Sequence, residues 1–243
     1  MSADRALAAR LLALLDLTNL DEDASPAAIE QLCGDAASGP VLPAAVCVYP
    51  EHVTTARREL DAAGAPAVAV ATVVNFPDGA DDAGRAVRET RRALAAGAGE
   101  IDLVFPWRAY VGGDRDGGRE MVQRCKETCG ARPLKVIIES GELGDLLLVR
   151  EVSAVALAAG ADFIKTSTGK MRSGATPEAA RAMLETIRTH GRAGFKASGG
   201  IRTLADAARY LELAGEIMGK DWATPARFRI GASSLLQELR AAV

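Results

Sequence analysis

The sequence has few histidines. The only two, His52 and His190, fall outside the predicted strands, and His190 stands before Gly191 as at a helix C-terminus. A three-histidine zinc site and a Ser-His-Asp triad therefore both lack parts. We expect no metal and no organic cofactor.

Cysteines are also few, and the four present (Cys33, Cys47, Cys125 and Cys129) do not suggest a disulfide framework in a chain of 243 residues. Cys125 and Cys129 lie one helical turn apart, without a histidine or further cysteine nearby. Helix packing is therefore favoured over half a metal site. Cys47 lacks a nearby base, so we expect it to pack or to line a site rather than to act as a nucleophile.

Long basic or apolar runs are missing as well. The formal net charge is −3 and no basic run exceeds two residues, which argues against nucleic acid or an anionic membrane as partner. No stretch approaches the roughly 18 apolar residues of a membrane span. The N-terminal segment predicts an amphipathic helix rather than a signal peptide. We therefore expect a cytoplasmic protein whose partner is a small molecule.

Short apolar segments alternate with helical patterns along the whole chain. Strand centres near residues 16, 46, 70, 102, 136, 164, 196 and 230 recur every 24 to 34 residues. The helices are predicted over 26 to about 34, 52–63, 81–96, 117–129, 143–159, 177–188, 203–214 and 234–242. Eight uninterrupted units predict one α/β domain over residues 1–243, a closed (β/α)8 or TIM barrel. An open doubly wound sheet is the alternative.

Charged residues occur where these strands should be apolar. They are Asp16, Asp102, Lys135, Lys165 and Lys196. Lysine and aspartate are almost never buried unless they are paired. Each could belong to a structural ion pair, such as Asp102 with Lys135. Buried ion pairs, however, are often replaceable by apolar residues without loss of stability, so the set as a whole favours a function.

Two of the lysines stand in equivalent settings. Lys165 and Lys196 each end an apolar strand and precede a turn of small residues and glycines. Burial disfavours the charged form of a lysine and lowers its pKa, and a second cation on a neighbouring strand would lower it further. We expect Lys165 to be a nucleophilic amine. A pKa near 7 instead of about 10.4 would raise its reactive fraction at neutral pH roughly a thousandfold.

Glycines and hydroxyl groups fill the last three turns that follow strands. The segments are 167–170 (STGK), 198–202 (SGGIR) and 231–234 (GASS). Glycines let backbone N–H groups approach an anion, and a helix that begins near Ser234 adds a partial positive charge. A phosphate site after strands 7 and 8 is frequent in barrels. The three turns together predict phosphate binding.

Long motifs resemble one family, the 2-deoxyribose-5-phosphate aldolases. The matching segments are LDLTNL, AAVCVYP, VATVVNFPDG, EIDLVF, LKVIIES, ADFIKTSTGK, FKASGGIRT and RIGASSLL. The family has the barrel fold and is a group of class I aldolases. The resemblance implies reversible cleavage of 2-deoxy-D-ribose 5-phosphate to D-glyceraldehyde 3-phosphate and acetaldehyde, without a metal or organic cofactor.

The resemblance also implies roles for residues. Lys165 would form the carbinolamine and then the imine, and Lys196 would lower the pKa of Lys165 with Asp16 hydrogen-bonded nearby. Asp102, paired with Lys135, would move protons through a water. Binding of substrate and phosphate would fall to Cys47, Thr18, Gly169, Lys170, Gly199, Gly200, Gly231, Ser233 and Ser234. Barrels of this kind often form homodimers.

One departure and two alternatives stay open. Some members of the family end in a flexible tail whose final tyrosine aids proton transfer, whereas this sequence ends QELRAAV without a tyrosine after Tyr210. The proton donor to the enamine is therefore open. The alternatives are a Schiff-base aldolase for another phosphorylated sugar and a non-catalytic sugar-phosphate binder.

Overall fold

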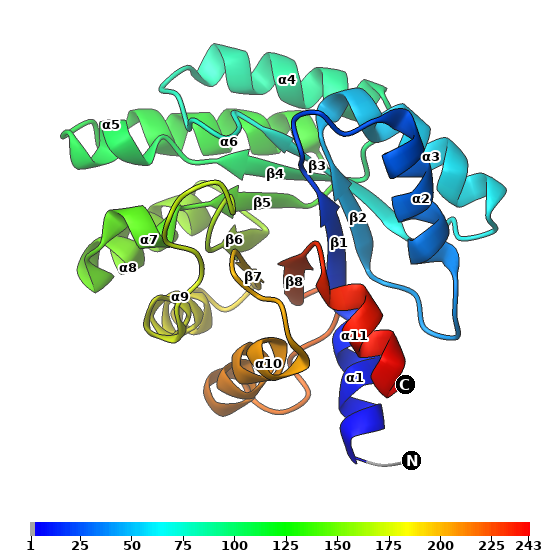
Figure 1. The fold of residues 1–243 in the computed structure, drawn as a ribbon. Coiled ribbons are helices and arrows are strands. Elements are labelled where there is room, and N and C mark those ends of the chain that lie inside the picture. The colour runs from blue at the N-terminus through cyan, green and yellow to red at the C-terminus, as the bar shows by residue number, and fades with distance from the viewer. Residues whose placement is uncertain (1–2) are drawn as a thin grey trace.

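The computed structural model describes residues 3–243, which form a closed barrel of eight parallel strands surrounded by helices (Figure 1). The strands are β1 Leu15–Asn19, β2 Ala45–Val48, β3 Ala69–Val74, β4 Glu100–Val104, β5 Leu134–Ile137, β6 Phe163–Lys165, β7 Gly194–Ser198 and β8 Phe228–Ala232. They follow chain order around the barrel, and β1 pairs with β8. The predicted single-domain TIM barrel is confirmed, and this closure rules out the open sheet.

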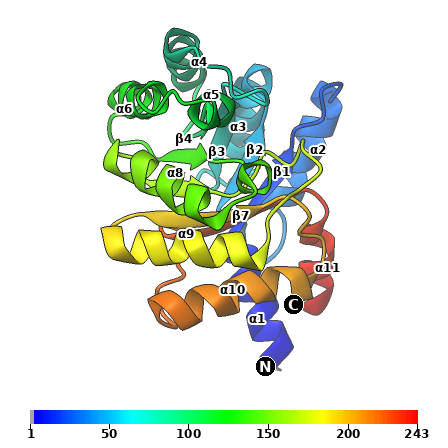
Figure 2. The same cartoon turned by 90° about the vertical axis from the view of Figure 1, so that its left-hand side faces the viewer.

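Helices follow the strands on the outside of the barrel. They are α1 Ala3–Ala13, α2 Pro26–Ala37, η1 Pro50–His52, α3 Val53–Ala62, α4 Ala83–Ala95, α5 Trp107–Val111, α6 Gly117–Cys129, α7 Ser140–Leu143, α8 Leu146–Ala158, α9 Pro177–His190, α10 Leu204–Met218 and α11 Leu235–Ala242. Figure 2 shows α8, α9 and α10 lying side by side, while α1 packs against α11. No helix in this part of the chain is both long enough and apolar enough to cross a bilayer.

Side-chain caps fix where several helices begin. Ser25, Asp82, Asp145, Thr176 and Thr203 each accept a hydrogen bond from a backbone N–H group of the first turn of the helix that follows. Such caps satisfy donors that a helix leaves unpaired at its start. The chain therefore turns into each of these helices at a defined residue, and this fixes the loops at the strands' C-terminal ends.

Two helices run three or more residues further than the sequence pattern predicted. The predicted end of α2 at about Gly34 was wrong, because the helix continues through that glycine to Ala37. Helix α10 likewise continues past Ala214 to Met218. The short elements η1, α5 and α7 were not predicted, since three to five residues are too few to show a helical period.

The two faces of the barrel strands differ in chemistry. Val46, Ile101 and Ile164 belong to the large core that packs the strands against the helices. On the inner face, β2 and β3 contribute a small apolar cluster that includes Cys47 and Ala71. The remaining strands place charged side chains inside. This alternation follows from the two-residue period of a strand.

The register aligns the predicted site residues. Lys165 of β6 is paired with Lys196 of β7, and Asp102 of β4 is paired with Lys135 of β5. The expectation that the two lysines lie on neighbouring strands is confirmed. All four cysteines are buried free thiols, and Cys125 and Cys129 pack in α6 as predicted.

One helical glycine is required by packing and another is not. A Cβ atom on Gly118 of α6 would lie 2.3 Å from the ring of Phe105, whereas one on Gly34 of α2 would meet nothing within 4 Å. We predict that Gly118→Ala lowers the free energy of unfolding by about 1–3 kcal/mol. Gly34→Ala should raise it by up to about 1 kcal/mol. Thermal or urea unfolding of both variants checks this, and a Gly118→Ala protein as stable as wild type would contradict it.

Candidate active site

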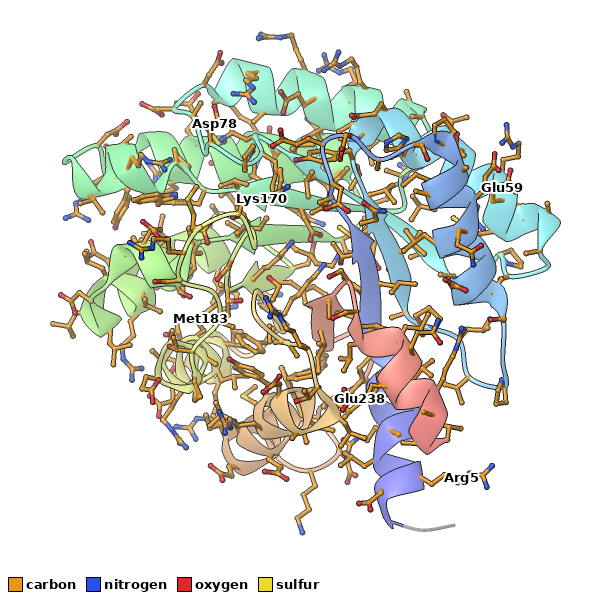
Figure 3. The ribbon with its side chains drawn as sticks, in the orientation of Figure 1. Arg5, Glu59, Asp78, Lys170, Met183 and Glu238 are labelled. Atoms are coloured by element: carbon orange, nitrogen blue, oxygen red, sulfur yellow. The ribbon has the colours of Figure 1, made fainter. Side chains whose placement is uncertain are left out.

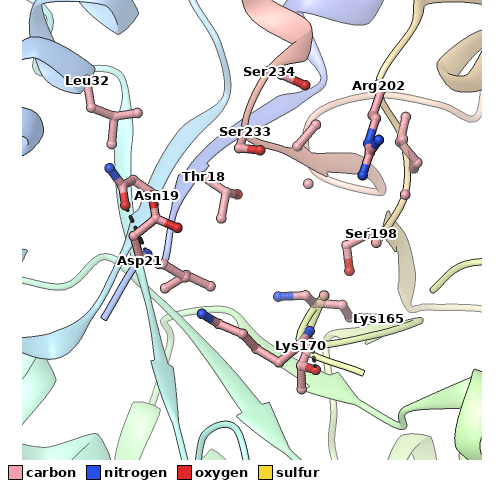
Figure 4. Close-up of a pocket in the computed structure, with 18 residues that line it drawn as sticks. Thr18, Asn19, Asp21, Leu32, Lys165, Lys170, Ser198, Arg202, Ser233 and Ser234 are labelled. Atoms are coloured by element: carbon pink, nitrogen blue, oxygen red, sulfur yellow. Dashed lines mark hydrogen bonds between the residues drawn. The ribbon is translucent and has the colours of Figure 1, made fainter. Parts of the chain in front are cut away.

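A cavity of about 490 Å³ opens at the C-terminal ends of the strands (Figure 4). It is lined mainly by the last residues of β1, β6, β7 and β8 and by the loops that follow them. The predicted site residues among them are Thr18, Lys165, Gly169, Lys170, Gly199, Gly200, Gly231, Ser233 and Ser234. The three glycine turns, far apart in sequence, therefore meet around one cavity, as barrel geometry requires.

Glycines shape the turn after β7. Gly199 and Gly200 have φ angles of 93° and 84°, which side-chain-bearing residues rarely adopt. A Cβ atom on Gly199 would also lie 3.0 Å from the Cα atom of Gly174. The backbone can thus turn sharply beside the cavity and expose its N–H groups to it.

Two cations and two hydroxyl groups line the cavity (Figure 4). Arg202 extends into it from the loop after β7 and Ser233 from the loop after β8, whereas Lys170, from the loop after β6, lies on the side of Lys165, with its Nζ atom 5.9 Å from the centroid of the Tyr49 ring. Ser234 lines the same wall at the start of α11. Figure 3 places Lys170 towards the middle of the ring of helices, whereas Arg5 and Glu59 lie on its outside. This arrangement suits a dianion such as a phosphate.

Beneath the cavity, Asp102 binds three lysines. Its Oδ2 atom accepts from Lys165 Nζ at 2.8 Å and from Lys196 Nζ at 2.9 Å, and its Oδ1 atom accepts from Lys135 Nζ at 2.9 Å. Strand β7 does not neighbour β4, so the Lys196 contact crosses the inside of the barrel. The predicted lysine pair and the predicted Asp102–Lys135 pair are both present, and they share one carboxylate.

Asp16 lies on the other side of Lys196. Its Oδ2 atom is 2.6 Å from Lys196 Nζ and 3.9 Å from Lys135 Nζ. Both lysines and both aspartates are fully buried, while Lys165 is 2% exposed and also lines the cavity. Lys165 is therefore the member of this group that a ligand in the cavity can reach.

Two charged residues of the barrel interior were not predicted from the sequence. Glu100 of β4 contacts Lys135 Nζ at 2.5 Å, and Arg229 of β8 contacts both Glu100 and Asp16. A signal was present, because Glu100 stands two residues before Asp102 and Arg229 two before Gly231. In a strand that spacing places side chains on one face. Arg202 and Ser198 of the cavity wall belong to the turn 198–202 that was predicted to bind phosphate, although neither was named as a binding residue.

Burial and charge set the pKa values of the lysines in opposite directions. Burial lowers the pKa of Lys165; the Asp102 carboxylate opposes this, Lys196 adds to it, and the net shift is downwards. Burial also acts to lower the pKa of Lys196, but Asp102 and Asp16 outweigh it and raise the value. Lys165 is thus the lysine of the pair that loses its proton first. The expected influence of the second cation is present, with burial as the larger cause.

The carboxylates of the interior remain ionised. Burial opposes ionisation of Asp102, but Lys135, Lys165 and Lys196 together hold its pKa well below the usual range. The pKa of Asp16 is lowered in the same way, with Lys196 and Arg229 overcoming the effect of burial. Both groups are consequently acceptors of hydrogen bonds at neutral pH.

Cys47 and Glu139 lie close to the lysines without lining the cavity. Cys47 is fully buried in β2, and burial raises the pKa of its thiol. Glu139 follows β5 and accepts from the backbone N–H of Thr168 at 3.2 Å, which ties the end of β5 to the loop that carries Lys170. Burial raises the pKa of Glu139. A ligand-binding role for Cys47 stays a prediction.

Residues 3–243 contain no group of three or more histidine, cysteine, aspartate or glutamate side chains arranged to hold a metal ion. The acidic side chains of the barrel interior are instead occupied by ammonium and guanidinium groups. The chemistry that this geometry supports is that of an amine.

Comparison with solved structures shows the same fold at similar length. A provisionally named deoxyribose-phosphate aldolase from Toxoplasma gondii ME49 has 28% sequence identity and a TM-score of 0.91, over 98% of this chain and 96% of that one. A provisionally named deoxyribose-phosphate aldolase from Coccidioides immitis has 27% identity and a TM-score of 0.83, over 96% and 87%. A tetrameric deoxyribose phosphate aldolase from Aeropyrum pernix, at 24% identity and a TM-score of 0.76 over 99% and 98%, shows the common fold alone.

A family profile covers nearly the whole chain. The profile described as DeoC/LacD family aldolase matches residues 10–240, a span that includes all eight strands and every loop around the cavity. The match agrees with a buried amine at the floor of a cavity with a cationic wall. This chain belongs to the DeoC/LacD family of aldolases.

Proposed function

We propose that this aldolase uses Lys165 to cleave 2-deoxy-D-ribose 5-phosphate reversibly to D-glyceraldehyde 3-phosphate and acetaldehyde, a step of deoxyribose phosphate catabolism. The observation that carries the proposal is the position of Lys165, which has a lowered pKa and stands at the floor of the cavity. The motif resemblance and the relatives from Toxoplasma gondii and Coccidioides immitis support the choice of substrate.

The reaction begins at the Lys165 amine. Its neutral form attacks the aldehyde carbon C1 of the open-chain sugar, and loss of water from the carbinolamine gives a protonated imine. Asp102 Oδ2 contacts both Lys165 and Lys196, so it can pass a proton between the two amines during these steps. Because Asp102 stays ionised, the protonated Lys196 is the acid within reach.

The imine supplies the electron sink for carbon–carbon cleavage. The C2–C3 bond breaks, its electrons move towards the iminium nitrogen to form an enamine, and the C3 hydroxyl loses its proton as the C3 carbonyl forms. Glyceraldehyde 3-phosphate leaves. The enamine then takes a proton at C2, and hydrolysis of the imine releases acetaldehyde and restores the Lys165 amine.

The upper cavity holds the phosphate end of the sugar in this proposal. Arg202, Ser233 and the backbone N–H groups near Gly200 provide charge and donors along the wall formed by the loops after β7 and β8, and Lys170 adds a second cation from the loop after β6. Anchoring the phosphate there leaves the aldehyde end to reach Lys165. Binding energy from a group that does not react can thus orient the one that does.

Trapping of the imine tests the role of Lys165. Incubation with acetaldehyde and sodium cyanoborohydride should add one two-carbon group to Lys165, as mass spectrometry of peptides would show. Lys165→Met should carry no adduct there and lose at least about 10⁴-fold in kcat. The matched variant Lys170→Met should still be labelled at Lys165. A labelled lysine elsewhere beside an intact Lys165 would refute the proposal.

Rates of sugar cleavage identify the substrate. Cleavage rates of 2-deoxyribose 5-phosphate, ribose 5-phosphate and fructose phosphates should favour the first, and dialysis against EDTA should leave the rate unchanged. A preference for a sugar hydroxylated at C2 would favour a different Schiff-base aldolase. Thermal stabilisation by these sugars without turnover would indicate a binding protein.

Loss of Lys196 should move the pH dependence of imine formation upwards. In Lys196→Met one cation beside Lys165 is gone and Asp102 retains fewer partners, so Lys165 holds its proton more tightly. The midpoint of acetaldehyde trapping should rise by about one pH unit or more, and trapping at pH 7 should fall about tenfold. An unchanged midpoint would mean that burial alone sets the pKa of Lys165.

A phosphate-binding role for Arg202 predicts a selective loss. Arg202→Gln should raise KM for 2-deoxyribose 5-phosphate about tenfold or more, because a charge-assisted hydrogen bond to phosphate is lost. The kinetics with unphosphorylated 2-deoxyribose should change little. Arg192→Gln, at an exposed position outside the cavity wall, serves as the control. Equal losses with both sugars would contradict this role.

A further inference from the structure

The lower barrel holds a buried cluster of seven charged side chains that we call the interior cluster. Its members are Asp16, Glu100, Asp102, Lys135, Lys165, Lys196 and Arg229, all of them buried. Three carry carboxylates, and four carry amines or a guanidinium. If all four basic groups were protonated, one positive charge would be left without a partner charge in a dry interior.

The contacts identify which basic group is left over. Lys135, Lys196 and Arg229 each touch at least two carboxylates, whereas Lys165 touches only Asp102, at an oxygen that Lys196 already occupies. Three cations and three carboxylates therefore balance with Lys165 uncharged. An isolated extra charge in such a medium costs several kcal/mol.

Arg229 is a cation of this balance that does not line the cavity. Its Nη1 atom is 2.6 Å from Asp16 Oδ1 and its Nη2 atom is 2.7 Å from Glu100 Oε1, and its Nε atom donates to the backbone carbonyl of Pro225. Asp16 in turn holds Lys196, and Glu100 holds Lys135. Arg229 thus occupies two carboxylates that would otherwise attract a proton to the lysines.

We propose that Arg229, acting through Asp16 and Glu100, is a positioning residue that keeps the Lys165 amine uncharged. The inference rests on the proposed function of Lys165 and adds a residue that does not touch the substrate. Without Arg229, three carboxylates face two cations, and protonation of Lys165 restores neutrality. Without Glu100, the cluster already carries an excess positive charge, and protonation of Lys165 becomes less favourable.

Other groups around Lys165 belong in this account. Those that face it or the interior cluster are Cys47 from β2 and Glu139 after β5, in addition to the cluster residues of β1, β4, β5, β7 and β8. Strand β3 contributes the apolar Ala71 and Val73. The Cys47 thiol is kept neutral by burial, and Glu139 is a separate carboxyl group that none of the variants below alters.

The test is the pH midpoint of acetaldehyde trapping at Lys165 with cyanoborohydride. Arg229→Met should raise the midpoint by about one pH unit and lower trapping at pH 7 about tenfold. Glu100→Gln should move the midpoint downwards. The double variant Arg229→Met/Glu100→Gln should return it towards the wild-type value, and Arg229→Lys should keep it there.

The outcomes separate this inference from the proposed function. If the wild-type protein traps no acetaldehyde on Lys165, the proposed function fails. If it does, but the two single variants shift the midpoint in the same direction or not at all, the role of Arg229 is refuted. Circular dichroism shows whether Arg229→Met folds. If it does not, the role of Arg229 is still tested by two results: the midpoint of Glu100→Gln should move downwards, and that of the double variant should lie near the wild-type value.

Discussion

The structure of the site depends on one oxygen atom, Oδ2 of Asp102, which contacts the amines of both Lys165 and Lys196. Two ammonium groups on the same oxygen in a buried site repel each other, so the interior accommodates one proton more readily than two. Lys196 also binds Asp16, and the two carboxylates raise its pKa, whereas burial lowers the pKa of Lys165. In the proposed mechanism, competition between the two lysines for this negative charge makes Lys165 the reactive amine.

The barrel fold provides enough stability to tolerate such a buried charged cluster. Burial of each ion costs several kcal/mol, and ion pairs in a dry interior repay that cost only when their geometry is good. Here the strands are fixed by hydrogen bonds on both sides, and the outer apolar core holds them against the helices. Stability is thus supplied by the outer layer, while the inner layer is free to carry charge. The charged set reaches the cavity through Lys165, where the proposed reaction would use it.

The sequence allowed a prediction wherever a residue differed in type from its neighbours in a regular pattern. Lys165, Lys196 and Asp102 are conspicuous in apolar strands, and the glycine turns are local patterns, so the barrel and most of the cavity wall could be predicted. Glu100 and Arg229 escaped because each stands at the beginning of its strand, where a charged residue looks like the end of a solvated loop. Only closure of the barrel, with β8 beside β1, brings Arg229 to Asp16.

The sequence predicted the pair of Asp102 with Lys135 but not the ion pairs that cross the inside of the barrel. The strand register aligns Asp102 with Lys135, yet Lys196 reaches Asp102 from a strand that is not its neighbour. A sequence pattern can indicate that a residue points inwards, but it does not give distances across the barrel. Short elements such as α7 were missed because one helical turn has no period to detect.

The barrel has two levels, the loops around the cavity and the strands beneath them. The loops after β6, β7 and β8 form the wall of the cavity, and loops can change without disturbing the strands. The interior cluster lies on the strands themselves, where a change in one charge alters the balance for all. Lys165 belongs to both levels, because it lines the cavity and contacts Asp102 below. In the proposed mechanism the loops around the cavity select the substrate, while the charges that set the protonation of the amine lie on the strands.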